Sequence, residues 1–385
     1  MSGQNESSTH PPLLPTTEED TVSRLRLLRS RRVGAVTYRR LLAEHGSAAK
    51  ALAALPDVAR AAGVDDYAVC PEAVALAELK AGKAAGARLL IAGTEDYPAA
   101  LNDLPDAPPL IWAIGRGEVL QRPMIAMVGA RNASSLGTRM AKRLAAELAE
   151  AGYAVVSGLA RGIDAAAHMG ALEGGTIAVQ AGGVDVIYPA ENARIATDIP
   201  KAGLRLSEMP MGLQPQARHF PARNRIISGL SQAVVVVEAA AKSGSLITAR
   251  NALDQGRDVM AVPGHPFDAR ASGCNMLIRD GATLVRNAAD VIEALGSASP
   301  RPRVKTATPP LPEPETPKAT PVRQLYPQAD LQAQIMARLA TAPVAEDQLL
   351  RDIKAPTARI APALIDLELE GKITRQSGGL LAITV

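Results

Sequence analysis

The spacing of apolar residues changes along the 385-residue chain and separates regions of different structure. Between residues 21 and 82, apolar residues recur at helical spacing, with breaks at Gly34 and Gly46. From residue 124 onward, short runs rich in Val, Ile and Ala alternate with helical stretches. Apolar strands that alternate with helices are typical of a parallel sheet covered by helices on both faces. The middle of the chain is therefore expected to be an α/β domain.

Strands of this domain are expected in the segments IAMVG, YAVVSG, TIAVQAG, LRLSEM, AVVVVEA and DVMAVPG, and a strand-like LIWAIG lies upstream. Ligands of such sheets bind beyond the carboxyl ends of the strands. The loops that follow these strands are therefore where binding residues are expected.

Composition divides the chain further. Residues 1–20 are polar and are expected to form a disordered tail, residues 21–82 a small helical domain, and residues 83–296 the α/β domain. Residues 297–327 are dense in Pro, Thr and charge, which is typical of an extended linker. Residues 328–385 fit three helices and a terminal hairpin, the order of a winged helix.

The predicted winged helix is expected to turn its hairpin at Gly378-Gly379. Winged helices either read DNA or dock on proteins. Acidic residues on the expected third helix, Asp366, Glu368 and Glu370, favour an auxiliary role without DNA reading.

Charge and composition narrow the classes of function. The net charge is only +3, so any polyanion must be bound by local clusters of cations. Two Phe, one Trp and six Tyr are too few for an extended aromatic platform. A cluster of arginines lies in the helical domain, and it fits a phosphate-facing surface and a solvated face equally well: Arg24, Arg26, Arg29, Arg31, Arg32, Arg39 and Arg40.

Three features of the sequence bear on the cellular compartment in which the protein is expected. Cys70 and Cys274 have no metal-binding or disulfide context, so they are expected to be reduced thiols. No signal-peptide pattern opens the chain, and no apolar run is long enough for a membrane span. A cytoplasmic protein without membrane contact is expected.

Four loops at expected strand ends share an anion-binding chemistry of small residues and cations. Glycine lets a backbone approach a ligand, arginine donates a planar fork, and amides at a helix start attract anions. The first three loops contribute Gly129 and Arg131, then Ser157, Gly158 and Arg161, then Phe220, Arg223, Asn224 and Arg225 at an expected helix start. The fourth contributes Lys242, Ser243, Gly244 and Ser245.

The residue patterns of these loops indicate which class of phosphate ligand they could bind. GARNASSLG lacks the third glycine of a dinucleotide-binding loop, and no Walker P-loop occurs. Several basic loops in a row suit successive phosphates of a nucleic-acid strand. Phe220 could stack on a base, and it fits a core position equally well.

Catalysis is disfavoured by the sequence. Asp164 and His168 share a helix face, and Glu208 and Glu238 lie at the ends of strands. A metal-dependent nuclease could use these residue types. Asp164 also fits a helix-capping position and His168 lies among small apolar residues, so a metal site is the weaker interpretation. No nucleophile elbow is present. We expect a binding protein with no catalytic residue, metal or cofactor.

Six motifs follow one another along the chain: MVGARNASSLG, VVSGLARGIDAAAHMGAL, HFPARNRIISGLS, KSGSLITARNAL, GRDVMAVPG and SGCNMLIRDGA. In their order and spacing, the chain resembles the DprA/Smf DNA-processing family. The resemblance implies an extended Rossmann-like domain, a sterile-alpha-motif-like helical domain and a winged helix. It also implies single-stranded DNA binding, a homodimer, and loading of the RecA recombinase during natural transformation. The implied strand-binding residues are Arg131, Ser157, Gly158, Arg223, Asn224, Arg225 and Lys242 through Ser245.

The sequence leaves two rival functions open. Rossmann-like enzymes such as phosphoribohydrolases process nucleotides, but they use a PGGxGTxxE-type loop that this sequence lacks. A transcriptional regulator would rest on the winged helix alone. Asn132-Ala133 stands where many family members carry a basic residue or proline, which leaves the charge of the first loop open.

Overall fold

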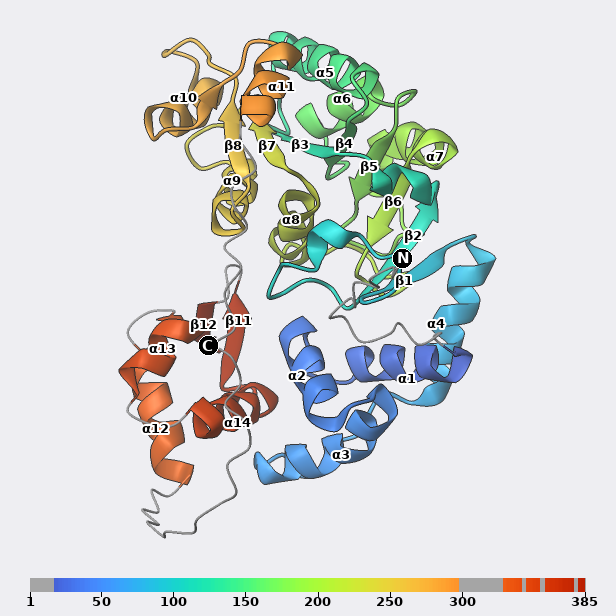
Figure 1. Ribbon diagram of the computed structural model, residues 1–385, viewed down its shortest axis with the longest axis vertical. Coiled ribbons are helices and arrows are strands. Elements are labelled where there is room, and N and C mark those ends of the chain that lie inside the picture. Colours follow the sequence, from blue (N-terminus) through green and yellow to red (C-terminus); the bar gives the residue numbers. More distant parts are fainter. Residues whose placement is uncertain (1–16, 298–327, 341–343, 354–356, 377–379, 385) are drawn as a thin grey trace, which may run out of the picture.

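The computed structural model describes residues 17–297, 328–340, 344–353, 357–376 and 380–384. It confirms the expected fold class: a helical N-terminal domain, a central Rossmann-like sheet with parallel strands, and a C-terminal winged helix (Figure 1). The expected tail, the expected linker and the Gly378-Gly379 turn lie outside the described residues, except for a few residues at their margins.

The N-terminal domain consists of α1 (Glu18–Arg29), α2 (Ala35–His45), α3 (Ala48–Ala61) and α4 (Glu72–Ala84). Thr17 caps α1 by accepting a hydrogen bond from the amide of Asp20, so the first helix begins before the expected boundary at residue 21. Apolar residues at helical spacing, among them Leu27, Leu41 and Leu55, form a core cluster of this domain.

The central sheet has nine strands in the order β1-β2-β6-β5-β4-β3-β7-β8-β9. The strands are β1 (Arg88–Ile91), β2 (Leu110–Gly115), β3 (Met124–Val128), β4 (Ala154–Ser157), β5 (Thr176–Val179), β6 (Leu204–Ser207), β7 (Ala233–Val236), β8 (Asp258–Ala261) and β9 (Thr283–Leu284). The strands from β6 to β9 in this order run parallel, and β2 pairs antiparallel with both β6 and β1. The parallel strands were expected; the antiparallel edge was not.

Helices cover both faces of the sheet (Figure 1). Ile125 and Met127 of β3 face one apolar layer, whereas Ala126 and Val128 face the other, because side chains alternate along a strand. The first layer includes α5 (Ser135–Glu150), α6 (Ile163–Gly170) and α11 (Ala288–Ser297), and α7 (Ala193–Ala202) packs beside α6. The second includes α8 (His219–Leu230), α9 (Ser245–Asp254) and α10 (Ser272–Arg279). Two-sided burial explains why the strands are almost continuously apolar.

The winged helix comprises α12 (Gln328–Leu339), β10 (Val344–Ala345), α13 (Glu346–Asp352), α14 (Thr357–Leu369), β11 (Ile373–Gln376) and β12 (Leu380–Ile383). Its strands form an antiparallel sheet in the order β10-β12-β11. Helix α14 lies against α3 of the N-terminal domain (Figure 1). No helix in the described part of the chain is long and apolar enough to cross a bilayer.

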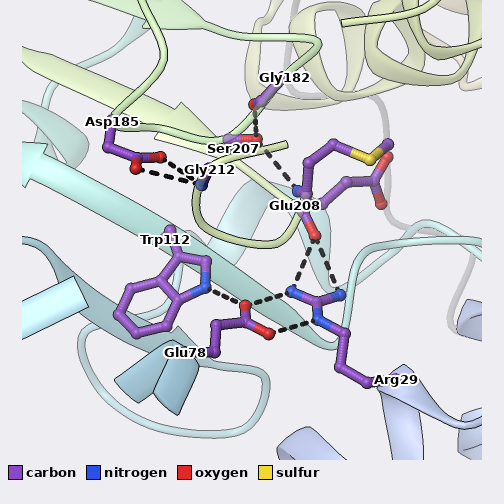
Figure 2. Close-up of polar contacts among 9 residues, drawn as sticks. Arg29, Glu78, Trp112, Gly182, Asp185, Ser207, Glu208 and Gly212 are labelled. Carbon is purple, nitrogen blue, oxygen red and sulfur yellow. Dashed lines mark hydrogen bonds and ion pairs between the residues drawn. The ribbon is translucent and has the colours of Figure 1, made fainter. Parts of the chain in front are cut away.

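A mostly buried ion pair within the N-terminal domain lies against the antiparallel edge of the sheet and is hydrogen-bonded to it (Figure 2). Arg29 donates to both carboxylate oxygens of Glu78, at 2.9 and 2.8 Å. Glu78 also accepts a hydrogen bond from the indole nitrogen of Trp112 on β2, at 2.8 Å. The Glu78 carboxylate thus connects α1 and α4 to the central sheet, and its negative charge neutralises the guanidinium of Arg29.

Most of the N-terminal arginines bind the protein itself. Arg39 donates to the carbonyl oxygens of Leu104, Pro105 and Ala107, and Arg26 donates to the carbonyl of Cys70. Arg24 pairs with Asp20 within α1, and Arg40 pairs with Glu346 of the winged helix. Arg31 and Arg32 are exposed. The cluster is therefore mainly a set of contacts between segments.

We predict that Glu78→Ala lowers the free energy of unfolding by about 3 kcal/mol, because removal of one partner leaves a buried, uncompensated Arg29. Trp112 is the single tryptophan of the chain, so its fluorescence during urea unfolding reports on this junction directly. The control Asp57→Ala removes an exposed pair with Arg60 and should change stability by less than about 0.5 kcal/mol. Equal effects of the two variants would contradict the structural role of Glu78.

Candidate nucleic-acid interface

The carboxyl ends of the parallel strands lie along one edge of the sheet, as the sequence predicted. β3 stands between β4 and β7, and the chain builds β4, β5 and β6 on one side before returning to β7 and β8 on the other. Such a reversal of strand order opens a crevice in which α/β proteins bind their ligands. The loops after β3 and β7 therefore flank the point at which the strand order reverses, and the loops after β4 and β5 follow along the same edge.

The loop after β3 presents an exposed cation. Arg131 is exposed, and its guanidinium carbon lies 5.1 Å from the centre of the Phe220 ring. Gly129 has no room for a side chain, because a Cβ there would meet Ile163 and the carbonyl of Glu238 within 3 Å. Ser134 caps α5 by accepting from the amide of Gly137, at 2.9 Å.

The anion position at the start of α5 is filled by the protein's own carboxylate. Glu238, just after β7, accepts hydrogen bonds from the amide of Ser134 at 2.9 Å and from its hydroxyl group. A Cβ at Gly137 would collide with this carboxylate, so the glycine makes the space that Glu238 occupies. Dinucleotide-binding folds hold a phosphate at the equivalent helix terminus. Glu238 was not assigned this role from the sequence.

The loop after β4 is held from below by three buried polar side chains. Asp164 accepts from the amides of Gly158 and Ala160, at 3.1 and 3.4 Å. Asn192 donates to the carbonyls of Leu159 and Ala160, at 2.9 and 3.0 Å. Leu159 adopts a left-handed φ of 58°, a strained backbone that these hydrogen bonds offset.

His168 completes the support of this loop. Its Nε2 accepts from the amide of Leu159 at 3.3 Å, and its Nδ1 lies 2.7 Å from the hydroxyl of Thr176. Because that hydroxyl donates to the carbonyl of Val155, the imidazole donates to it through Nδ1 and is neutral. Burial, together with the charge of Arg223, lowers the pKa of His168 to about 3.

Arg223 lies inside the molecule. Its side chain is buried, and Nη1 donates to the carbonyl of Gly158 at 2.6 Å and to the carbonyl of Val179. Burial outweighs the opposing charge of Asp164 and lowers the pKa of Arg223 to about 10. Burial raises the pKa of Asp164, and Arg223 opposes that shift in turn. The two groups compensate each other's charge beneath the loop after β4.

The segment Arg223-Asn224-Arg225 lies one turn further into helix α8 than the sequence suggested. α8 begins at His219, so Arg223, Asn224 and Arg225 occupy its second turn. Arg225 is mostly buried and pairs with Glu208, and its Nε lies 3.5 Å from Asp106. Neither arginine of this segment presents an open guanidinium to solvent in this conformation.

Phe220 is partly buried and lies outside the apolar core clusters. Its ring is 6.0 Å from that of Tyr188, which comes from the loop after β5 and is 51% exposed. Arg131, Phe220 and Tyr188 thus form a cation–aromatic cluster, which we call the stacking cluster. Tyr188 was missed from the sequence because a single tyrosine in a long loop gives no local signal.

The remaining predicted cations are exposed on the loops after β4 and β7. Arg161 lies 3.6 Å from Glu191, and both side chains are exposed. Lys242 is exposed before Ser243, whose hydroxyl lies 2.7 Å from that of Ser245. Gly244 is exposed at the start of α9, and Ser157 is buried and donates to the carbonyl of Met127.

The predicted site residues therefore divide into two groups. One group is exposed at the crevice, and the other is buried beneath it and holds the loops. Within the described residues, no group of three or more His, Cys, Asp or Glu side chains could hold a metal ion. Asp164 and His168, the candidates for a nuclease site, accept hydrogen bonds from amides of the loop after β4, and the second ring nitrogen of His168 bonds to Thr176.

The structure is a Rossmann-like domain with cationic loops along one edge of its sheet, flanked by a small helical domain and a winged helix. Residues 88–296 match the family described as DNA recombination-mediator protein A. Residues 18–81 match the DprA-like N-terminal HHH domain, and residues 307–379 match the DprA winged helix domain. The chain belongs to this DNA recombination-mediator family, which confirms the resemblance seen in the sequence motifs.

Individual relatives agree with this assignment. The chain is 46% identical over 198 residues to DNA processing protein DprA of Streptococcus pneumoniae, which covers 51% of this chain and 70% of the relative. It is 43% identical over 220 residues to DprA of Bacillus subtilis, covering 56% of this chain and 74% of the relative.

Two solved structures are also similar. The crystal structure of S. pneumoniae DprA has a TM-score of 0.59 and 36% identity, and covers 71% of this chain and 96% of that one. A structure of DprA from Helicobacter pylori, described as showing its single-stranded DNA binding mode, has a TM-score of 0.51 and 31% identity. That similarity covers 55% of this chain and 96% of the other.

We predict that the neutral His168 makes the central domain acid-labile. Its pKa is lower when folded than when unfolded, so its contribution is present above pH 6.5 and is lost as the pH falls towards 3. Between pH 7.5 and 5 the loss should be about 2 kcal/mol, measured by urea unfolding. His168→Gln should remove this part of the pH dependence, and the exposed His265→Gln should retain it. An unchanged pH dependence in His168→Gln would contradict the assignment.

Proposed function

We propose that this protein binds single-stranded DNA along the carboxyl edge of its sheet and delivers the strand to a recombinase. The observation that carries the proposal is the stacking cluster, in which Arg131 covers Phe220 beside the exposed Tyr188. Aromatic rings flanked by cations bind unpaired bases regardless of sequence, because every base has a stacking face. The single-stranded DNA binding mode described for the H. pylori relative supports this proposal.

The proposed contacts differ between the two groups of residues. Arg131, Arg161 and Lys242 are exposed and would each neutralise a phosphate, while Phe220 and Tyr188 would stack on bases. The amides and hydroxyls of residues 243–245 would donate hydrogen bonds to a further phosphate at the start of α9. Arg223 and Arg225, first expected to contact phosphates, instead position the loops and α8 from within.

The hand-over of the strand is the second part of the proposal. Family members are described as recombination mediators, and a mediator must present DNA to the recombinase with its bases accessible. Phosphate contacts from loop cations leave most base edges free, which suits the transfer. We extend the proposal to RecA as the recombinase, to a homodimer that holds a longer strand, and to the cytoplasm as the place of action.

A nucleotide-processing enzyme is the rival function, and Glu238 disfavours it. A nucleotide phosphate at the start of α5 would meet the carboxylate that already accepts from Ser134. Like charges at that distance repel, so mononucleotide binding there would require Glu238 to leave.

We expect Lys242→Ala to weaken binding of a single-stranded oligonucleotide and to reduce the magnitude of the log–log salt slope by roughly 0.7, the contribution of one phosphate contact. Fluorescence anisotropy over a range of salt concentrations measures both quantities. Lys80→Ala removes an exposed lysine of α4, far from the edge, and serves as the matched control. A slope equal to that of the parent protein would exclude Lys242 from the contact.

Phe220→Ala should behave differently. Loss of a stacked base weakens binding by about 1–3 kcal/mol and leaves the salt slope unchanged, since no charge is removed. Leu253→Ala truncates an exposed apolar residue near the end of α9 and should leave the affinity unchanged. If Phe220→Ala binds as tightly as the parent protein, the stacking cluster does not contact bases.

The mediator role needs a separate measurement. On DNA coated with single-strand binding protein, addition of this protein should speed assembly of RecA filaments, followed by ATP hydrolysis. Lys242→Ala and Phe220→Ala should lose this acceleration in proportion to their lost affinity. Normal DNA binding without any acceleration would reject RecA loading and leave the DNA-binding proposal standing.

A further inference from the structure

The winged helix turns its third helix towards the N-terminal domain. Ile365 of α14 is buried in the apolar cluster of α1, α2 and α3, together with Leu27 and Tyr38. The core of the winged helix is a separate cluster that includes Ile335, Leu364 and Leu381. Ile365 therefore contributes to docking and belongs to no core of its own domain.

A half-buried ionic network surrounds this apolar contact. Arg40 of α2 pairs with Glu346 at the start of α13, and Thr37 of α2 donates to Glu368 of α14 at 3.2 Å. Arg375 of β11 lies 2.7 Å from Glu346 and 2.6 Å from Glu368, so it holds both carboxylates towards α2. The side chains of these four charged residues are between 10% and 24% exposed.

The docked winged helix covers one side of a cleft beside α8. The cleft has a volume of about 930 Å³, and all three domains line it. Arg32 comes from the N-terminal domain, Arg218 and Arg225 come from the start of α8 and its second turn, and Arg375 and Glu368 come from the winged helix. The same helix α8 carries Phe220 of the stacking cluster.

In a helix-turn-helix unit the second helix enters the DNA groove, and α13 and α14 form that unit here. The end of α14 that carries Ile365 and Glu368 is engaged with the N-terminal domain, and its carboxylates would repel phosphates. The partner that this face fits is therefore the chain's own helical domain.

We propose that the winged-helix domain is an intramolecular latch, docked on α2 and α3 through Ile365 and the Arg40–Glu346–Arg375–Glu368 network, and that it restricts the cleft beside α8. Its effect on DNA rests on the function proposed above; the docking itself does not.

Small-angle X-ray scattering of the full chain tests the docking without DNA. Arg40→Glu replaces attraction to Glu346 by repulsion, and Ile365→Ser removes the apolar contact without a change of charge. Both should raise the radius of gyration by roughly a tenth, since one compact body becomes two. Arg40→Lys keeps the charge and should stay closed, as should the control Arg60→Glu, whose exposed side chain pairs within α3. Unchanged scattering in both opening variants would overturn the latch.

Two DNA measurements then test its role. Ile365→Ser should bind a long single-stranded oligonucleotide several-fold more tightly than the parent, because the cleft beside α8 is uncovered. Equal affinity, with scattering that shows the open state, would reject the shielding of the cleft. Neither opening variant should gain sequence-specific binding to duplex DNA. Such a gain would show that α14 is a masked DNA reader and would overturn its assignment as a docking helix.

Discussion

The buried guanidinium of Arg223 is the interaction on which the candidate interface depends. A cation inside a protein is stable only when charge and hydrogen bonds compensate its lost hydration. Arg223 finds this compensation in the carbonyls that end β4 and β5 and in the carboxylate of Asp164. Gly158 is required at the end of β4, because a Cβ there would overlap the guanidinium. The same contacts fix the second turn of α8 and hence the place of Phe220.

Anion recognition is used within the protein as well as at its surface. Glu238 satisfies the amide and hydroxyl of Ser134 at the start of α5, the position at which a dinucleotide-binding fold would bind phosphate. The crevice therefore keeps its Rossmann-like framework while its usual nucleotide position is closed. Arg131, Arg161 and Lys242 remain exposed on separate loops, which form the outer rim of this edge. A rim of separated cations suits a long polyanion better than a single nucleotide.

The sequence predicted the framework well because burial on two sides leaves a strong local signal. Apolar strands such as IAMVG and AVVVVEA lie where they were expected, and the glycine- and serine-rich loops follow them. Which arginines face solvent could not be predicted. Arg131 and Arg223 look alike in sequence, and only the register of α8 against β4 and β5 makes one exposed and the other buried. Tyr188 and Glu238 act through partners distant in the chain, so no local pattern revealed them.

The arginines of the N-terminal domain are a second case in which the sequence did not predict which side chains face solvent. Their density suggested a phosphate-binding face, but Arg29 and Arg39 donate to carbonyl oxygens of the α/β domain, and Arg40 pairs with the winged helix. Arg131, Arg161 and Lys242 remain exposed on loops that follow parallel strands, and the central claim is that single-stranded DNA lies there. Ultraviolet crosslinking of a 5-iodouracil-substituted single strand, mapped by mass spectrometry, tests this directly. Crosslinks at Tyr188 and Phe220 are the expected result, whereas crosslinks confined to the N-terminal helices or the winged helix would contradict it.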